Sequence, residues 1–154
     1  MGAYFLDTSA LVKRNARESG TAWVRDLTRS DSPHDLYIAR ISIVEMVAAI
    51  TRRERGGHLT AAQAAAVIGH FRKRASDLYL VVELSPALFD DASRLARKHG
   101  LRGYDAVQPA AALAINQPRP ARGLPPVTLV SADAELNLAA LAEGLFVENP
   151  NQHA

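Results

Sequence analysis

The sequence predicts an α/β fold in which a central parallel sheet of four to five strands lies between layers of helices. Short, continuously apolar segments alternate along the chain with longer amphipathic ones, a pattern typical of parallel strands covered on both faces. No repeat or low-complexity tract interrupts this order, and 154 residues suffice for one packed core. We therefore expect residues 1–154 to form a single domain.

The first quarter of the chain predicts two strands and two helices. Residues 3–6 are apolar throughout and predict the first strand, and Asp7 with its two hydroxyl neighbours provides caps for a helix that begins over 9–14. Residues 19–30 space their apolar side chains as a helix does. A turn rich in Asp, Ser and Pro then leads into a second strand at 36–39.

The middle of the chain predicts two helices and a strand. Residues 42–55 combine helical apolar spacing with a basic end, and the Gly-Gly pair at 56–57 stops this helix. Thr60 starts the next helix, which runs to the basic residues 72–74. The mostly apolar residues 78–84 predict the third strand.

The last part of the chain repeats the strand–helix order. Its elements are a helix that starts at Ser85-Pro86 and ends at Gly100, a helix opened by Gly103-Tyr104-Asp105 and running to 115, a strand at 127–130, a helix at 134–143, and an edge strand at 145–147 if the sheet has five strands. Four prolines and one glycine between residues 117 and 126 predict a surface loop before the last clear strand.

The composition excludes several classes of protein. Hydrophobic residues at 48% and charged residues at 22% are ordinary for a globular protein, and no segment approaches the roughly 18 apolar residues of a membrane span. We expect no signal peptide. The absence of cysteine excludes disulfides and cysteine–zinc sites, and it fits a cytoplasmic location. A net charge of +2 does not by itself indicate nucleic-acid binding.

Four carboxylates lie where a parallel sheet gathers its active groups, beyond the carboxyl ends of its strands. Asp7 follows the first strand and Asp133 the last clear one, while Glu45 and Asp105 lie in the first turns of helices that start at the same edge. Each has a simpler explanation. Asp7 and Asp133 fit N-caps, Ser42-x-x-Glu45 fits a capping box, and Asp105 favours a helix dipole.

These separate explanations do not account for the coincidence of four acids. All four adjoin strongly apolar segments, where an unpaired carboxylate is costly. Two like charges at about 4 Å repel by roughly 4 kcal/mol at an effective dielectric constant of about 20. A divalent cation would relieve this repulsion, and oxygen ligands favour Mg²⁺ or Mn²⁺ over zinc. A site of this kind supports in-line displacement at a phosphodiester.

The blocks that contain these acids carry a family resemblance. They are Tyr4-Phe5-Leu6-Asp7-Thr8-Ser9-Ala10-Leu11-Val12-Lys13, Ser42-x-x-Glu45, Gly100-Leu101-Arg102-Gly103-Tyr104-Asp105-Ala106-Val107-Gln108 and Leu129-Val130-Ser131-Ala132-Asp133. In this order they resemble the signature blocks of PIN-domain ribonucleases, and most closely the VapC toxins of type II toxin–antitoxin systems. The resemblance implies a PIN-like α/β/α sandwich and a Mg²⁺-dependent endoribonuclease, with Mn²⁺ able to substitute. It also implies a homodimer silenced by an antitoxin protein.

The resemblance also assigns roles to residues. It makes Asp7 and Asp105 the core metal ligands, completed by Glu45 directly or through water, while Asp133 holds a second ion or positions the attacking water. The hydroxyls of Thr8 and Ser131 match positions near the metal. One departure is Pro109, where related sequences usually have leucine; it lies early in its helix, where a missing N–H costs less.

Three basic residues are candidates for binding RNA phosphates: Lys13 and Arg14, which follow Asp7 by one to two turns, and Arg52, which shares a helical face with Glu45. The alternative is that they are solvated helix ends that complement the dipole. We interpret the basic run at 72–74 in this second way.

Rival functions fit the sequence less well. A phosphatase of the HAD type needs an aspartate where Ser9 stands, and a receiver domain needs a lysine after its last strand, where residues 131–133 supply none. A DNA-directed 5′ nuclease usually has a longer chain with more acids. A catalytically idle PIN domain that binds RNA or protein stays open, and metal-dependent cleavage would distinguish it.

Overall fold

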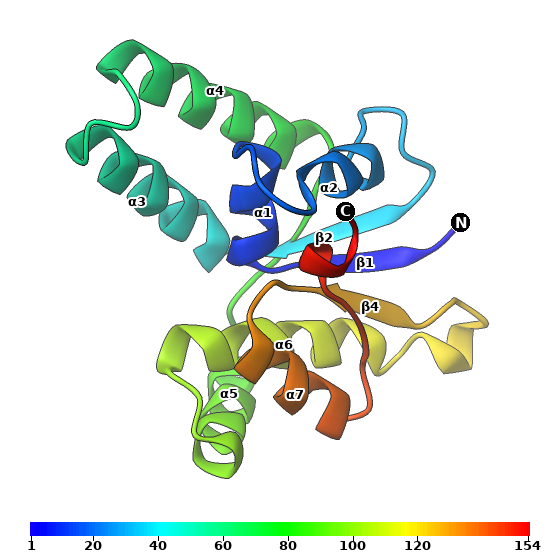
Figure 1. Cartoon of the computed structure of the whole chain (residues 1–154). Coiled ribbons are helices and arrows are strands. Elements are labelled where there is room, and N and C mark those ends of the chain that lie inside the picture. Colours follow the sequence, from blue (N-terminus) through cyan, green and yellow to red (C-terminus); the bar gives the residue numbers. More distant parts are fainter.

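The computed structural model describes all 154 residues and contains a five-stranded parallel sheet in the order β3-β2-β1-β4-β5. The strands are β1 (Ala3–Leu6), β2 (Asp35–Ala39), β3 (Leu80–Val82), β4 (Val127–Val130) and β5 (Phe146–Glu148). Helices cover both faces, as Figure 1 shows, so the predicted α/β/α arrangement with a parallel sheet is confirmed. β5 is the fifth strand, at the edge expected for it.

One layer of helices contains α1 (Thr8–Arg14), α2 (Thr21–Leu27), α3 (Ile41–Arg55) and α4 (Ala61–Asp77), and the other contains α5 (Pro86–His99), α6 (Gly103–Asn116) and α7 (Ala134–Ala142). Each layer has its own hydrophobic core against the sheet. Leu6, Leu11 and Met46 pack on the first face, and Phe5, Leu95 and Leu129 on the second. Adjacent residues of β1 thus enter opposite cores, which explains why this strand is apolar throughout.

Several predicted boundaries move by a few residues. The second helix is shorter than predicted, α2 covering only Thr21–Leu27. The third strand is also shorter than the predicted 78–84, because α4 continues to Asp77 and Leu78 is its C-cap. The loop at 117–126 contains a short 3-10 turn, Pro120–Arg122. Pro109 is accommodated inside α6 without ending that helix.

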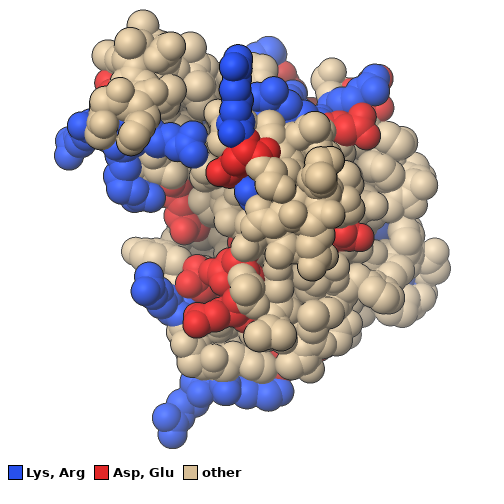
Figure 2. Space-filling model, viewed as in Figure 1, with Lys and Arg blue, Asp and Glu red and all other residues tan.

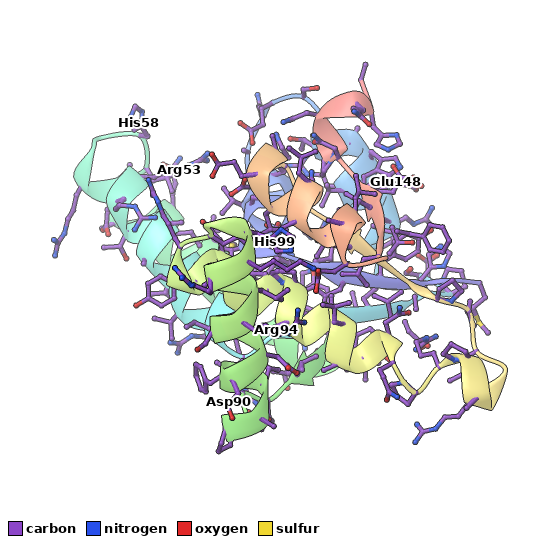
Figure 3. All side chains as sticks on the ribbon, turned by 90° about the horizontal axis from the view of Figure 1, so that it is seen from below. Arg53, His58, Asp90, Arg94, His99 and Glu148 are labelled. Carbon is purple, nitrogen blue, oxygen red and sulfur yellow. The ribbon has the colours of Figure 1, made fainter.

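A group of ion pairs joins α5 to the end of α7. Glu143, the C-cap of α7, accepts hydrogen bonds from Arg94 at 3.0 Å and Lys98 at 2.7 Å, and its Oε2 lies 3.2 Å from His99 Nε2. Figure 3 shows Arg94 and His99 along α5, beside α6 and α7. These cations hold the pKa of Glu143 far below its usual range, at about 2.

None of the helices is both long and apolar enough to pass through a membrane.

Candidate metal centre

Asp7 is a buried carboxylate at the carboxyl end of β1, and only 4% of its surface is exposed. Its Oδ1 accepts hydrogen bonds from Ser9 Oγ at 2.6 Å and from the N–H of Ala10 at 3.0 Å, and its Oδ2 accepts one from Ser131 Oγ at 2.7 Å. Burial raises its pKa to about 6 in spite of these three donors. Asp7 is therefore both the predicted N-cap of α1 and an incompletely compensated charge.

Asp133 occupies the corresponding position after β4. Its Oδ1 accepts from the N–H groups of Glu135 and Leu136 at 3.0 and 3.2 Å, so it caps α7 as its cap interpretation predicted. Its own N–H donates to Ser131 Oγ at 3.1 Å, and this hydroxyl in turn donates to Asp7. Ser131 thus joins the two strand ends, and the charge of Asp133 helps to raise the pKa of Asp7.

Glu45 reaches the same edge from α3, but not through the predicted capping box. The helix begins at Ile41, one residue earlier than expected, and Ser42 lies inside it, so the capping-box interpretation is wrong. The Glu45 Oε1 instead accepts from Thr8 Oγ1 at 2.9 Å and from Gln108 Nε2 at 3.1 Å. Partial burial raises the pKa of Glu45, and Asp105 raises it further.

Asp105 lies in the first turn of α6 and is partly exposed. Its pKa is raised by burial first and then by Asp133 and Glu135, while Arg102 opposes them. Electrostatic coupling therefore links the four predicted acids in a row, from Asp7 through Asp133 and Asp105 to Glu45. Figure 2 shows Asp and Glu side chains gathered on the left, in the hollow between the α3–α4 arm and the helices below the sheet.

The four acids do not form a compact ligand set in this structure. No three Asp, Glu or His side chains lie close enough together to hold a metal ion by themselves. Mg²⁺ is, however, usually bound by one or two carboxylates together with water and substrate phosphates. Asp7, Asp105, Glu45 and Asp133 offer only oxygen atoms, and burial followed by neighbouring carboxylates raises the pKa of Asp7, Glu45 and Asp105, so a divalent cation would relieve this unfavourable charge. The donor set fits such an ion.

Hydroxyl and amide groups hold the acids in place. Gln108 is buried, and its Nε2 lies within hydrogen-bonding distance of Ser42 Oγ (3.1 Å), Glu45 and, at 3.4 Å, Thr8 Oγ1. Thr8 and Ser131, the two hydroxyls predicted to lie near the metal, contact Glu45 and Asp7 respectively.

Four residues that the structure places here were not predicted to belong to the metal site: Ser9, Ser42, Gln108 and Glu135. The spacing of Gln108 three residues after Asp105, on the same helical face, is the one signal that could have identified it. Ser9, Ser42 and Glu135 lie within three residues of predicted site residues, but nothing in the sequence shows which of these neighbours face the site.

The three basic candidates differ in their surroundings. Lys13 is buried, and its Nζ is 3.1 Å from Glu18 Oε1 and donates to the Ser19 carbonyl at 3.0 Å, so its charge is engaged within the fold and its role in RNA binding stays a prediction. Arg14 is half-buried and joins no ion pair. Arg52 is exposed beside Glu45 and lines a cavity of about 490 Å³ with Thr8, Val44 and Tyr104. The roles of Arg14 and Arg52 in RNA binding stay predictions.

Comparison with known proteins identifies similar sequences and a similar fold. A PIN-domain family model matches residues 4–141. Ribonuclease VapC45 of Mycobacterium tuberculosis (strain CDC 1551 / Oshkosh) is 31% identical over 121 residues, which cover 77% of this chain and 80% of that protein. The structure of PAE2754 from Pyrobaculum aerophilum is similar with a TM-score of 0.61 and 25% identity, covering 96% of this chain and 92% of that one.

A further similar structure, VapBC2 from Rickettsia felis bound to a promoter DNA fragment, gives a TM-score of 0.62 at 17% identity over 96% of this chain and 98% of that one. At this identity the likeness shows the fold alone. The family model and the curated relative go further and confirm the resemblance that the four sequence blocks indicated. The chain belongs to the PIN-domain family and is a relative of the VapC ribonucleases.

Proposed function

We propose that this chain is a Mg²⁺-dependent endoribonuclease that hydrolyses RNA phosphodiester bonds, with Mn²⁺ as a substitute ion. The observation that carries the proposal is the row of four coupled carboxylates at the carboxyl edge of the sheet, none of which is paired with a cation. The relative VapC45 is named a ribonuclease. The requirement for a metal and the assignment of its ligands are part of this proposal.

Asp7 and Asp105 would hold the ion, with Glu45 and Asp133 completing its surroundings directly or through water. The ion, when bound, supplies positive charge to a phosphate oxygen and lowers the pKa of a coordinated water. Ser9, Ser131 and the N–H of Ala10 fix both oxygens of Asp7. Thr8 and Gln108 both donate hydrogen bonds to Oε1 of Glu45. Its Oε2 has no protein donor, so Oε2 can take up a proton or accept a hydrogen bond from a water molecule.

The neighbouring cavity suits a nucleic-acid segment. It combines the apolar side chains of Ile41, Val44 and Tyr104 with the guanidinium of Arg52, next to the hydroxyl of Thr8. Tyr104 and Val44 are 64% and 68% exposed, which is unusual for side chains of this size and type. An aromatic ring beside a cation can contact a base and a phosphate of the same strand.

The proposal includes partners. Similar folds occur in complexes described as VapBC2 bound to promoter DNA and as a toxin–antitoxin complex from Klebsiella pneumoniae. We therefore propose that this chain is the toxin of such a pair, that an antitoxin protein silences it and that it acts in the cytoplasm as a homodimer. The alternative is a catalytically idle PIN domain that binds RNA or protein.

The test pairs metal binding with cleavage. Mn²⁺ is titrated calorimetrically into metal-free wild-type protein and into an Asp7→Asn/Asp105→Asn variant, and both are assayed on total RNA. The control is Asp26→Asn/Asp31→Asn, which removes two exposed carboxylates that pair with Arg29. Loss of both activities in the first variant alone supports the proposal. Metal binding without cleavage supports the idle domain, and no metal binding by the wild type overturns the proposal.

A further inference from the structure

Three arginines from three helices meet at the far end of α1. Arg14 ends α1, Arg25 lies in α2 and Arg74 lies in the last turn of α4. Arg25 Nε donates to the Arg14 carbonyl at 2.9 Å, and Arg74 donates to the carbonyl of Thr28 just after α2. Tyr79 lies near enough to Arg14 to influence its pKa, which it raises. We call Arg14, Arg25, Arg74 and Tyr79 the arginine cluster.

The arginine cluster has no counter-ion. None of its arginines takes part in an ion pair, and burial together with Arg74 and Arg25 lowers the pKa of Arg14. The acids on the neighbouring segments pair with other residues, namely Glu18 with Lys13, Asp26 with Arg29 and Asp77 with Lys73. No carboxylate therefore forms an ion pair with the cluster, and the groups that accept hydrogen bonds from it are the carbonyls of Arg14 and Thr28.

Three polar atoms of the cluster are buried without a hydrogen-bond partner: Nε of Arg14, Nε of Arg74 and the hydroxyl of Tyr79. Helix-end carbonyls explain why Arg25 and Arg74 are stable in this position. They do not explain Arg14, whose guanidinium donates to no protein group. Charges gathered and partly desolvated in this way are unfavourable unless a group of opposite charge joins them.

We propose that the arginine cluster is an anion-binding site that takes a phosphate group. A guanidinium matches the geometry of phosphate oxygens and binds them in pairs. Arg25 is exposed and Arg14 and Arg74 are half-buried, so solvent reaches the cluster. Resting on the proposed function, we assign the phosphate to the RNA backbone away from the cleaved bond, because the seven residues of α1 separate Arg14 from Asp7 by about 10 Å.

The first experiment uses inorganic phosphate and needs neither metal nor cleavage. Melting temperatures are compared in phosphate and in sodium chloride of equal ionic strength, for the wild type, Arg14→Gln and Arg14→Lys. Arg29→Gln is the control, because it removes the same charge from an exposed side chain paired with Asp31. We expect a rise of about 3–6 °C for the wild type and Arg29→Gln at phosphate about tenfold above Kd. Arg14→Gln should lose this rise, and Arg14→Lys should retain only part of it.

The second experiment identifies the source of the phosphate. Binding of a labelled single-stranded RNA is measured in EDTA over a range of salt concentrations. Arg14→Gln should weaken binding about 5–10-fold and reduce the log–log salt slope by about 0.7, the share of one phosphate contact. In the cleavage assay the same variant should raise KM and leave kcat unchanged, because this site is remote from the reacting bond.

The outcomes separate this site from the nuclease proposal. Equal phosphate stabilisation of the wild type and Arg14→Gln would overturn the anion site even if RNA is cleaved. Phosphate stabilisation lost in Arg14→Gln, with no RNA binding by the wild type, would support the site and overturn its assignment to RNA. If Arg14→Gln does not fold, Arg14→Lys decides, since full retention of both phosphate and RNA binding would show that paired recognition by the guanidinium is absent.

Discussion

Asp7 and Glu143 are two scarcely exposed carboxylates with opposite electrostatic surroundings. Asp7 is 4% exposed, the Glu143 side chain is 8% exposed, and each has three donors or partners within 3.2 Å. The pKa of Glu143 is lowered to about 2, whereas the pKa of Asp7 is raised to about 6. The number of contacts therefore does not decide the difference.

Burial is the main cause that raises the pKa of Asp7, whereas charged donors, Lys98 first, lower the pKa of Glu143. Glu143 contacts two cations and a histidine, while Asp7 contacts two hydroxyls and a backbone N–H, which cannot offset the loss of hydration. A carboxylate that is paired with cations of the same chain stabilises the structure. Glu143 is such a residue, because its ion pairs join α5 to the end of α7. A carboxylate that the fold buries but leaves without a cation is a candidate functional group, because such a perturbation persists where function requires it.

If Asp7 is a functional carboxylate and Glu143 a structural one, the largest difference between their variants should be in RNA cleavage. Asp7→Asn keeps a side chain that can cap α1 but removes the charge, so we expect cleavage to fall at least 100-fold, on the order of an essential electrostatic contact. Glu143→Gln should cleave within about threefold of the wild type under conditions where it is folded, and single-turnover rates measure both. Similar losses in the two variants would contradict the division into a functional and a structural carboxylate.

The next effect is on the pH dependence of stability in metal-free buffer. Because the folded state raises the pKa of Asp7 from 3.8 to about 6, it binds more protons than the unfolded state in that range, and stability falls as pH rises through it. This pKa shift changes the free energy of unfolding by at most about 3 kcal/mol. Denaturant unfolding between pH 4 and pH 7 should show this decline in the wild type and a flatter curve in Asp7→Asn.

Asp7→Asn should also melt a few degrees higher than the wild type at neutral pH without metal, because the buried charge is gone. A lower melting temperature would favour the interpretation of Asp7 as a structural cap alone. The same scan with Mn²⁺ should stabilise the wild type and leave Asp7→Asn unchanged if Asp7 is a ligand.

Glu143 should show the opposite pH dependence with a smaller amplitude. Its pKa is lowered from 4.5 to about 2. Its contribution to the free energy of unfolding is therefore complete above about pH 4.5 and is lost as pH falls toward 2. The three partners include exposed side chains, so we expect Glu143→Gln to cost about 1 kcal/mol at pH 7. Denaturant unfolding of this variant at pH 3 and pH 7 should show the difference from the wild type shrinking at the lower pH.

Sequence patterns predicted Asp7 and could not predict Glu143, for a physical reason. The strand–helix order depends on local apolar spacing, and Asp7 is marked by its position at the end of an apolar strand. The partners of Glu143 lie 44 to 49 residues away along the chain, and no local sequence pattern predicts these contacts. The capping box predicted at Ser42 shows the same limit, because α3 begins at Ile41 and Ser42 lies inside the helix, where the local pattern did not place it.

Lys13 and Arg14 differ in the same way as Glu143 and Asp7, and the expected effects are smaller. The sequence alone gave no reason to distinguish these two adjacent basic residues. Lys13 is paired, as Glu143 is, and Arg14 is unpaired, as Asp7 is. Lys13→Met should keep the packing of the buried stem and cost less than about 1 kcal/mol. It should leave the salt slope of RNA binding within about 0.2 of the wild type, because its charge already neutralises Glu18. A slope reduced as far as that of Arg14→Gln would show that pairing within the fold does not distinguish structural from functional charges in this protein.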